Sequence, residues 1–239
     1  MIISKTPFRI SFFGGGTDYP AYYLENGGSV IATAIDKYCY ISLRNLPPFF
    51  EHKYRIVYSK IDNAKTIDEI EHPAVRGILQ YANCNEGLEI HHDGDLPARS
   101  GLGSSSSFTV GLLNALNSLN KKECNKMDLA LEAIELEQNI LNEAVGSQDQ
   151  VSAAFGGLNR INFNKDGSIQ VIPLSLDSET IKELDDNLLL FYTGITRFSY
   201  PFAQKKINNV SKNLSLLERM TETVSYTHLR AHETREERV

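Results

Sequence analysis

Alternating and continuous apolar runs, separated by glycine turns, dominate the first hundred residues. Residues 1–13 are rich in β-branched and aromatic side chains and run into the glycines at 14–16, which predicts a strand and a tight turn. Residues 29–45 have the same composition and predict two more strands. The runs at 54–59 and 87–97 predict further strands, the second ending in a turn.

Helical patterns interrupt these strands. Residues 107–120 are apolar at spacings of three and four and predict a buried helix, as residues 127–142 predict a second. A third begins near Ser147 and ends at the glycines 156–157. Two shorter helices are expected. One is capped by Thr17 or Asp18, has Pro20 in its first turn and ends at Gly27; the other, at 72–83, opens with Pro73.

The last third of the chain predicts a hairpin and a polar segment. Residues 158–163 and 168–174 form the two arms of the expected hairpin, with its turn at 164–167. Residues 187–195, "NLLLFYTGI", predict a buried strand, and a polar helix should begin near Tyr200. There is no internal repeat, and the mixed order of strands and helices predicts an α+β fold.

Composition narrows the class of protein. The chain has 239 residues, 41% of them hydrophobic and 23% charged, which is ordinary for a soluble globular protein of one large or two smaller domains. The net charge of −6 argues against a general nucleic-acid binder, although it leaves room for an anionic substrate. Three cysteines without CxxC spacing predict neither disulfides nor a zinc site. With neither a signal peptide nor a membrane-length apolar run, we expect a cytoplasmic protein.

The stretch "SGLGSSSSF", residues 100–108, carries the first chemical signal. Composition alone would make it a flexible linker, but it lies between a strand with a tight turn and an apolar helix. A glycine turn that opens a helix presents unpaired N–H groups and the positive end of the helix dipole, and this combination binds phosphate. A serine-capped helix with a glycine turn explains the residues equally well. Neither a Walker A nor a Rossmann pattern is present.

Three charged residues each allow a plain and a catalytic interpretation. Glu137 shares a helix face with apolar residues, so it is either an edge carboxylate that reaches water or an oxygen ligand for Mg²⁺. Asp149, in the first turn of a predicted helix, either favours the helix dipole or acts as a base for a hydroxyl that attacks phosphorus. Arg9 is either a solvated cation on a strand or a fixed guanidinium beside a phosphoryl group.

Taken together, three stretches resemble the GHMP kinases. "PFRISFFGGGTDYP" is similar to the first motif of that superfamily, "LPARSGLGSSSSF" to its second, and "VGSQDQVSAAFGG" to the segment that carries its catalytic aspartate. They occur in the family's order, and the resemblance runs from residue 1 to about residue 223. It implies a GHMP-kinase N-terminal domain of the ribosomal S5 domain 2-like type.

The resemblance also implies roles for individual residues. The backbone of the loop would wrap the phosphates of ATP. Asp149 would lie beside the attacking hydroxyl, and Arg9 beside both it and the γ-phosphate. Glu137 and Ser105 would hold Mg²⁺. Asp18, Tyr19 and Gly16 would contact the sugar. The loop residues concerned are Gly101, Leu102, Gly103, Ser104, Ser105 and Ser106, with Ser104 or Ser105 doubling as the helix cap.

Within the superfamily, "FFGGGTDYPAYY" and "GSQDQV" look like the branch of heptose phosphate kinases. That branch implies ATP-dependent phosphorylation of the anomeric hydroxyl of D-glycero-D-manno-heptose 7-phosphate, giving the 1,7-bisphosphate for nucleotide-activated heptose and surface polysaccharide. A galactokinase- or fucokinase-like enzyme is the alternative, and a sugar- or nucleotide-binding fragment without turnover is another. The implied partners are a small sugar phosphate and ATP, with neither nucleic acid nor membrane.

The end of the chain departs from the family. The superfamily has a third glycine-rich motif in a C-terminal ferredoxin-like domain, and no such run follows residue 198. We therefore expect an ATP-binding domain over 1–185 and only the start of the second domain over 186–223. Residues 224–234, "VSYTHLRAHET", look like one reading frame of a sequencing-library adapter, so we expect 224–239 to be an artefact. A long read of the source DNA across codons 223 and 224 tests this expectation.

Overall fold

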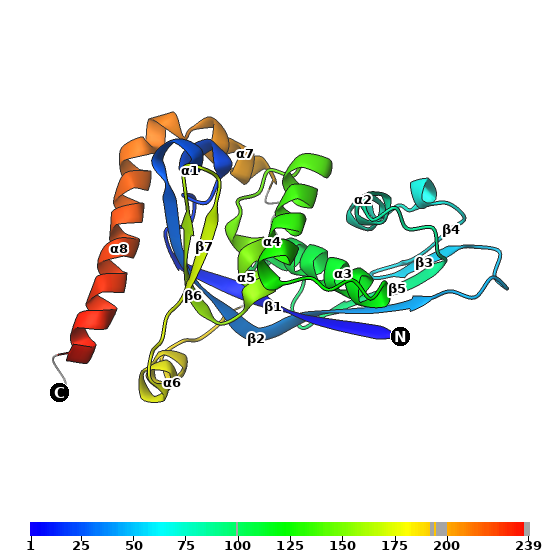
Figure 1. Ribbon diagram of the computed structural model, residues 1–239, viewed down its shortest axis with the longest axis horizontal. Helices are drawn as coiled ribbons and strands as arrows, with labels where there is room; N and C mark the ends of the chain where they lie inside the picture. Colours follow the sequence, from blue (N-terminus) through cyan, green and yellow to red (C-terminus); the bar gives the residue numbers. More distant parts are fainter. Residues whose placement is uncertain (99, 192–193, 195–199, 237–239) are drawn as a thin grey trace.

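The structure is a computed structural model that describes residues 1–98, 100–191, 194 and 200–236. A seven-stranded sheet organises it, in the order β4-β3-β5-β2-β6-β7 with β1 alongside β2 (Figure 1). Every pairing is antiparallel except that of β3 with β5. The strands are β1 (Ile2–Phe13), β2 (Gly28–Asn45), β3 (Tyr54–Val57), β4 (Ile61–Ala64), β5 (Leu88–Gly94), β6 (Leu158–Phe163) and β7 (Ile169–Pro173).

Strand β2 is the spine of this sheet. It is a single strand of 18 residues, so the expectation of two strands over residues 29–45 was wrong. The reason is its neighbours: β1 follows one edge over most of its length, while β6 and β5 share the other edge, with β6 on its first half and β5 on its second. The predicted hairpin of β6 and β7 is confirmed.

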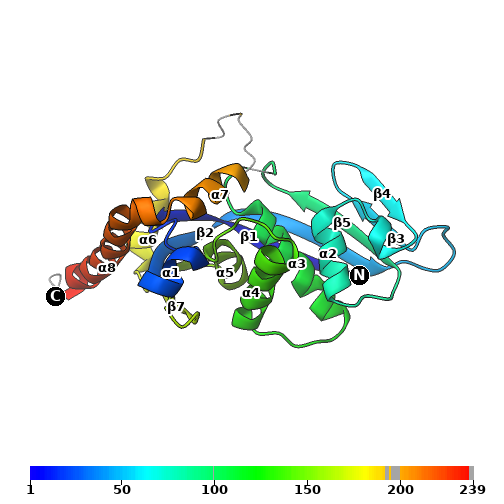
Figure 2. The same ribbon diagram turned by 90° about the horizontal axis from the view of Figure 1, so that it is seen from above.

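Helices cover one face of the sheet, with α3 among them (Figure 2). The predicted apolar helix is confirmed as α3 (Ser104–Leu119), which packs on β1 and β2 in the centre of the core. Around it lie α2 (Pro73–Tyr81), α4 (Lys126–Glu135) and α5 (Gln148–Phe155). The helix expected over 127–142 divides into α4 and a π-helical turn, Leu136–Ile140. The short helix α1 (Pro20–Asn26) is also confirmed.

The last helix lies against the opposite face of the sheet. Side chains of β6 alternate, so that Ile161 belongs to the core while Arg160 points away from it and donates a hydrogen bond to Ser225 Oγ (3.3 Å). Ser225 belongs to α8 (Leu214–Glu236), whose Val224 is fully buried beside Gly14. The helix predicted from about residue 200 is confirmed as α7 (Tyr200–Asn208). The predicted domain limits and the artefact in the tail stay predictions.

The strand expected over 187–195 was wrong for the part that the structure describes. After α6 (Ser178–Asp186), which the sequence did not predict, residues 187–191 form no strand. Leu189 and Phe191 are 81% and 76% exposed, because no other strand of the described chain lies beside them. Residues 192, 193 and 195 lie outside the described residues. Within the described ranges, every helix is too short or too polar to cross a membrane.

Candidate active site

The glycine- and serine-rich stretch forms a turn that leads directly into α3. Gly101 and Gly103 both have left-handed backbones, with φ of 80° and 77°, which glycine adopts without steric cost. Gly103 itself is the residue that caps α3, and no side chain bonds the cap, so the expectation that Ser104 or Ser105 caps the helix was wrong. The first turn of α3 consists of serines, and Ser107 N donates to Gly103 O (2.9 Å). The N-terminal end of a helix carries a partial positive charge, and here that end faces the glycine turn.

Arg9 joins this loop to α5. The backbone N–H of Arg9 donates to Leu102 O (3.0 Å), and its Nη1 donates to Gly101 O (3.0 Å). On its other side, Nε and Nη2 donate to Asp149 Oδ1 (2.7 Å) and Oδ2 (2.6 Å). The side chains of Arg9 and Asp149 are only 14% and 24% exposed, so the bidentate pair is partly shielded from water. Arg9 is therefore not a solvated strand cation.

The loop, the arginine and the aspartate meet at one point. A Cβ atom on Gly103 would lie 3.3 Å from Arg9 Cγ and 3.5 Å from Asp149 Oδ2. Asp149 occupies the first turn of α5, which begins directly after Ser147, where the sequence predicted the helix to start. Two positively polarised helix ends and one guanidinium thus converge beside one carboxylate, an arrangement suited to an anionic phosphoryl group and a hydroxyl.

Glu137 lies behind the first turn of α3. It sits on the π-helical turn and is 0% exposed, which excludes the edge carboxylate that reaches water. Its Oε2 accepts hydrogen bonds from Ser106 Oγ (2.8 Å) and Gln150 Nε2 (2.5 Å), while its Oε1 has no partner among the described residues. Burial raises the pKa of Glu137 to about 7, against the lowering effect of the Thr109, Ser106 and Gln150 side chains.

The structure therefore pairs Glu137 with Ser106. Ser105, which the family resemblance pairs with Glu137, is exposed in this structure. A buried oxygen without a hydrogen-bond partner lowers the stability of the fold by about 1–3 kcal/mol unless a proton or a cation binds to it. The donor set of one carboxylate and nearby hydroxyls suits Mg²⁺, a cation that takes hard oxygen ligands. The metal role of Ser105 and Glu137 stays a prediction.

Asp18 connects the glycine turn after β1 to the start of α5. The backbone N–H groups of Gly16 (2.9 Å) and Gln148 (3.3 Å) donate to its carboxylate, and Ser147 N donates to its carbonyl (3.0 Å). Asp18 is 1% exposed, and burial, followed by the charge of Asp149, raises its pKa. Neither Thr17 nor Asp18 caps α1, contrary to the expectation, because Tyr19 takes that position.

Tyr19 lies close to the same carboxylates. It is partly exposed, and burial together with the charges of Asp18 and Asp149 raises the pKa of its phenol. Gly16 has a left-handed backbone with φ of 109°, and a Cβ there would lie 3.5 Å from Leu217 of α8. Asp18 and Tyr19 thus feel the charge of Asp149, and Gly16 donates to Asp18. The contact of these three residues with a sugar stays a prediction.

Three residues of the site were not predicted in the roles that the structure gives them. Ser106 was expected only as part of the loop backbone, yet its hydroxyl bonds Glu137. Gln150 was not singled out, although it directly follows Asp149 in the sequence. A Cβ on Gly146 would lie 1.9 Å from Asp18 Oδ2, so only glycine fits there. None of these contacts leaves a local signal, because each joins segments that are distant in sequence.

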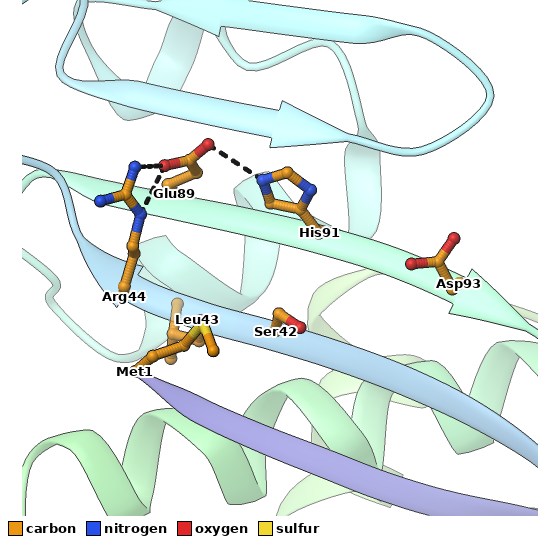
Figure 3. A pocket seen from close by; sticks show the side chains of 7 residues that line it. All are labelled: Met1, Ser42, Leu43, Arg44, Glu89, His91 and Asp93. Carbon is orange, nitrogen blue, oxygen red and sulfur yellow. Dashed lines mark hydrogen bonds and ion pairs between the residues drawn. The ribbon is translucent and has the colours of Figure 1, made fainter.

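A separate hollow of about 200 Å³ lies on the sheet face away from α3 (Figure 3). Met1 and Asp93 are at its rim, and Glu89 is held inside it by Arg44 Nε (2.7 Å) and His91 Nε2 (2.9 Å). These bonds lower the pKa of Glu89, with His91 the largest cause. The carboxylate is thus fully engaged by its neighbours, and the hollow offers no reactive group comparable to the Arg9–Asp149 pair.

Known proteins resemble this chain in both sequence and fold. Residues 68–157 match the family model of the GHMP kinases N terminal domain, a range that includes the loop, Glu137 and Asp149. The solved structure of a D-glycero-D-manno-heptose 1-phosphate kinase from Bacteroides thetaiotaomicron superposes on 97% of this chain and 73% of its own, with a TM-score of 0.80 and 22% identity. The family match and the superposition thus identify residues 68–157 as a GHMP kinase N-terminal domain, in a chain with the GHMP kinase fold.

Two curated relatives show which kinases the sequence is similar to. The D-glycero-alpha-D-manno-heptose 7-phosphate kinase of Campylobacter jejuni is 28% identical over 224 residues, covering 90% of this chain and 66% of its own length. The galactokinase of Pyrococcus furiosus is 31% identical over 222 residues, covering 86% and 57%. Both relatives are sugar kinases. The chain spans about two thirds of the first relative's length and less of the second's.

Proposed function

We propose that the protein is an ATP-dependent sugar kinase that phosphorylates the anomeric hydroxyl of D-glycero-D-manno-heptose 7-phosphate. The observation that carries the proposal is the bidentate pair of Arg9 and Asp149 against the turn at Gly101–Gly103. The similarity to a heptose 7-phosphate kinase supports the choice of sugar. The similarity to a galactokinase supports the alternative, an unphosphorylated hexose.

The loop and the α3 terminus would bind the phosphates of ATP. Helix amides and left-handed glycines offer N–H donors without a side chain in the way. A guanidinium has five N–H groups, and the bonds of Arg9 to Asp149 and Gly101 use three of them. The remaining two are available to the γ-phosphoryl oxygens, so Arg9 can neutralise charge there without leaving Asp149.

Asp149 would orient the acceptor hydroxyl. The sugar oxygen attacks the γ-phosphorus, the bond from that phosphorus to the β–γ bridging oxygen breaks, and ADP departs with the electron pair. The hydroxyl proton passes to the Asp149 carboxylate as the new bond forms. Because phosphoryl transfer depends mainly on position and charge neutralisation, the fixed Arg9–Asp149 geometry is the main contribution of this chain. Mg²⁺, when bound at Glu137, would supply charge neutralisation at the phosphates.

The test is a coupled assay of ADP release with a panel of sugars, made on this chain and on the product of the complete gene. We expect turnover with heptose 7-phosphate and little with galactose or fucose. Turnover with the free hexoses alone would replace the proposed substrate by the alternative. ATP binding without turnover by this chain, with turnover by the complete gene product, would identify this chain as a binding fragment.

Asp149→Asn tests the role of the carboxylate. We expect kcat to fall roughly 100-fold or more, because the variant cannot accept a proton, while the dissociation constant for ATP changes little. Isothermal titration calorimetry measures the second quantity. Near-normal turnover by Asp149→Asn would contradict the assigned role.

A further inference from the structure

The geometry points to Gln150 as a positioning residue that confines cation binding by Glu137 to a single carboxylate oxygen, Oε1. This inference rests on the proposed function, since it concerns the cation that accompanies ATP. It goes further by assigning a role to Gln150 and by predicting which cations the site prefers.

The first step is the asymmetry of the Glu137 carboxylate. Both of its hydrogen bonds, from Ser106 and from Gln150, end on the same oxygen, Oε2. Oε1 is enclosed by protein and has no partner in the described chain. The Thr109 hydroxyl, which lies close enough to lower the pKa of this carboxyl, donates its hydrogen bond to Ser105 O instead (3.3 Å). Oε2 therefore has two hydrogen-bond donors, and Oε1 has none among the described residues.

The second step is the rigidity of the donors. Ser106 and Gln150 are 2% and 0% exposed, and they come from different helices, α3 and α5. The amide nitrogen of Gln150 must face the carboxylate, because a carboxylate offers only acceptors. Two fixed donors on opposite elements prevent the carboxylate from rotating to present both oxygens to one cation. Donors of this kind, which orient a ligand without touching the metal, commonly change metal affinity about 10- to 100-fold.

The third step is the chemistry of the cation. Mg²⁺ requires near-octahedral geometry and binds through few carboxylate oxygens, whereas Ca²⁺ is larger and readily accepts a bidentate carboxylate. A carboxylate limited to Oε1 favours Mg²⁺ over Ca²⁺. Because Gln150 directly follows Asp149, the helix that carries the proposed base also holds the proposed cation ligand in place.

The test measures cation preference rather than activity. Mn²⁺ is bound to this chain in the presence of a non-hydrolysable ATP analogue and followed by electron paramagnetic resonance, and Mg²⁺ or Ca²⁺ is then used to displace it. Gln150→Met keeps the length of the side chain but removes its donor. We expect the ratio of Mg²⁺ to Ca²⁺ affinity to shift roughly tenfold toward Ca²⁺ in this variant.

Two further variants keep the test decisive. Ser106→Ala removes the other donor to Oε2 and should shift the preference in the same direction, so it serves if Gln150→Met fails to fold. Ser152→Ala is the matched control, because Ser152 lies on the same helix, is 3% exposed and has a hydroxyl without a partner; we expect no shift. An unchanged ratio in both donor variants would overturn the inference. If the unsubstituted chain binds no Mn²⁺ with the nucleotide, the proposed function fails instead.

Discussion

At the scale of single residues, the site combines a satisfied charge pair with an unsatisfied carboxyl group. Arg9 and Asp149 neutralise each other through two hydrogen bonds, whereas Glu137 is buried without a cation among its described neighbours. A buried carboxylate without a counter-charge is costly, and burial is accordingly the largest cause of its raised pKa. The protein therefore gives up stability at Glu137 at neutral pH, which suits a residue kept for binding rather than for folding.

Glu137→Gln should reveal this cost as a pH-dependent gain in stability. The pKa of Glu137 rises from 4.5 to about 7 on folding. The favourable contribution of Glu137 to the free energy of unfolding is therefore complete below about pH 4.5 and is lost as pH rises through 7. At pH 8, without divalent cations, the variant should have a free energy of unfolding larger by roughly 3 kcal/mol. Chemical denaturation at several pH values measures the difference, which should vanish near pH 4. Equal stability at pH 8 would mean that the carboxyl is not desolvated.

At the scale of elements, Asp18 ties the turn after β1 to the beginning of α5. Three backbone N–H groups donate to this one residue, and Gly146 lies against its carboxylate without room for a side chain. The pairing of Arg9 with Asp149 depends on this joint, because Arg9 comes from β1 and Asp149 from α5. The joint therefore sets the distance between the two residues that the proposed reaction needs.

Gly146→Ala should destabilise the joint. The added methyl group would overlap Asp18 Oδ2, so we expect a loss of about 1–3 kcal/mol in the free energy of unfolding, together with weaker pairing of Arg9 and Asp149. A double-mutant cycle with Asp18→Ala identifies the cause, because the smaller side chain leaves room for the methyl group. The cost of Gly146→Ala should then fall below about 0.5 kcal/mol. Additive costs in the cycle would show that the clash lies elsewhere.

Sequence patterns predicted most elements but few of their junctions. The helix α3 and the hairpin of β6 and β7 follow from local periodicity, and both are confirmed. The predicted cap of α3 was wrong, because Gly103, with its left-handed backbone, takes the cap position instead of a serine. The pairing of Arg9 with Asp149 spans 140 residues, and no local pattern reports it. Only the family resemblance brought the two together before the structure did.

At the scale of the whole molecule, the core and the candidate site lie on the same side of the sheet. The core lies between the sheet and the helices around α3, and the candidate site is at the edge of this core, where the loop, β1 and α5 meet. The apolar run after α6 lies outside this core, with Leu189 and Phe191 largely exposed. The sequence suggested a buried strand here because apolar runs report hydrophobicity and not the partner that a strand requires.

Leu189→Ser should therefore leave the fold unaffected. Its side chain is 81% exposed, so we expect the free energy of unfolding to change by less than about 0.5 kcal/mol. Leu112→Ala is the matched control: Leu112 is 0% exposed, and its loss should cost about 2–5 kcal/mol. Urea denaturation compares the two. A loss above about 2 kcal/mol for Leu189→Ser would show that this segment packs against the core in solution.

The separation of Arg9 from Asp149 has a consequence for synthesis on the ribosome. Strand β1 is made first, yet its arginine meets its carboxylate partner only after α5 has emerged. The first half of β2 likewise stays unpaired on one edge until β6 has been made. A growing chain is thus more than half made before the sheet edge is covered and Arg9 is paired with Asp149, so the candidate site forms only late in translation. The number of residues between β2 and β6 determines how long this edge of β2 stays unpaired during translation.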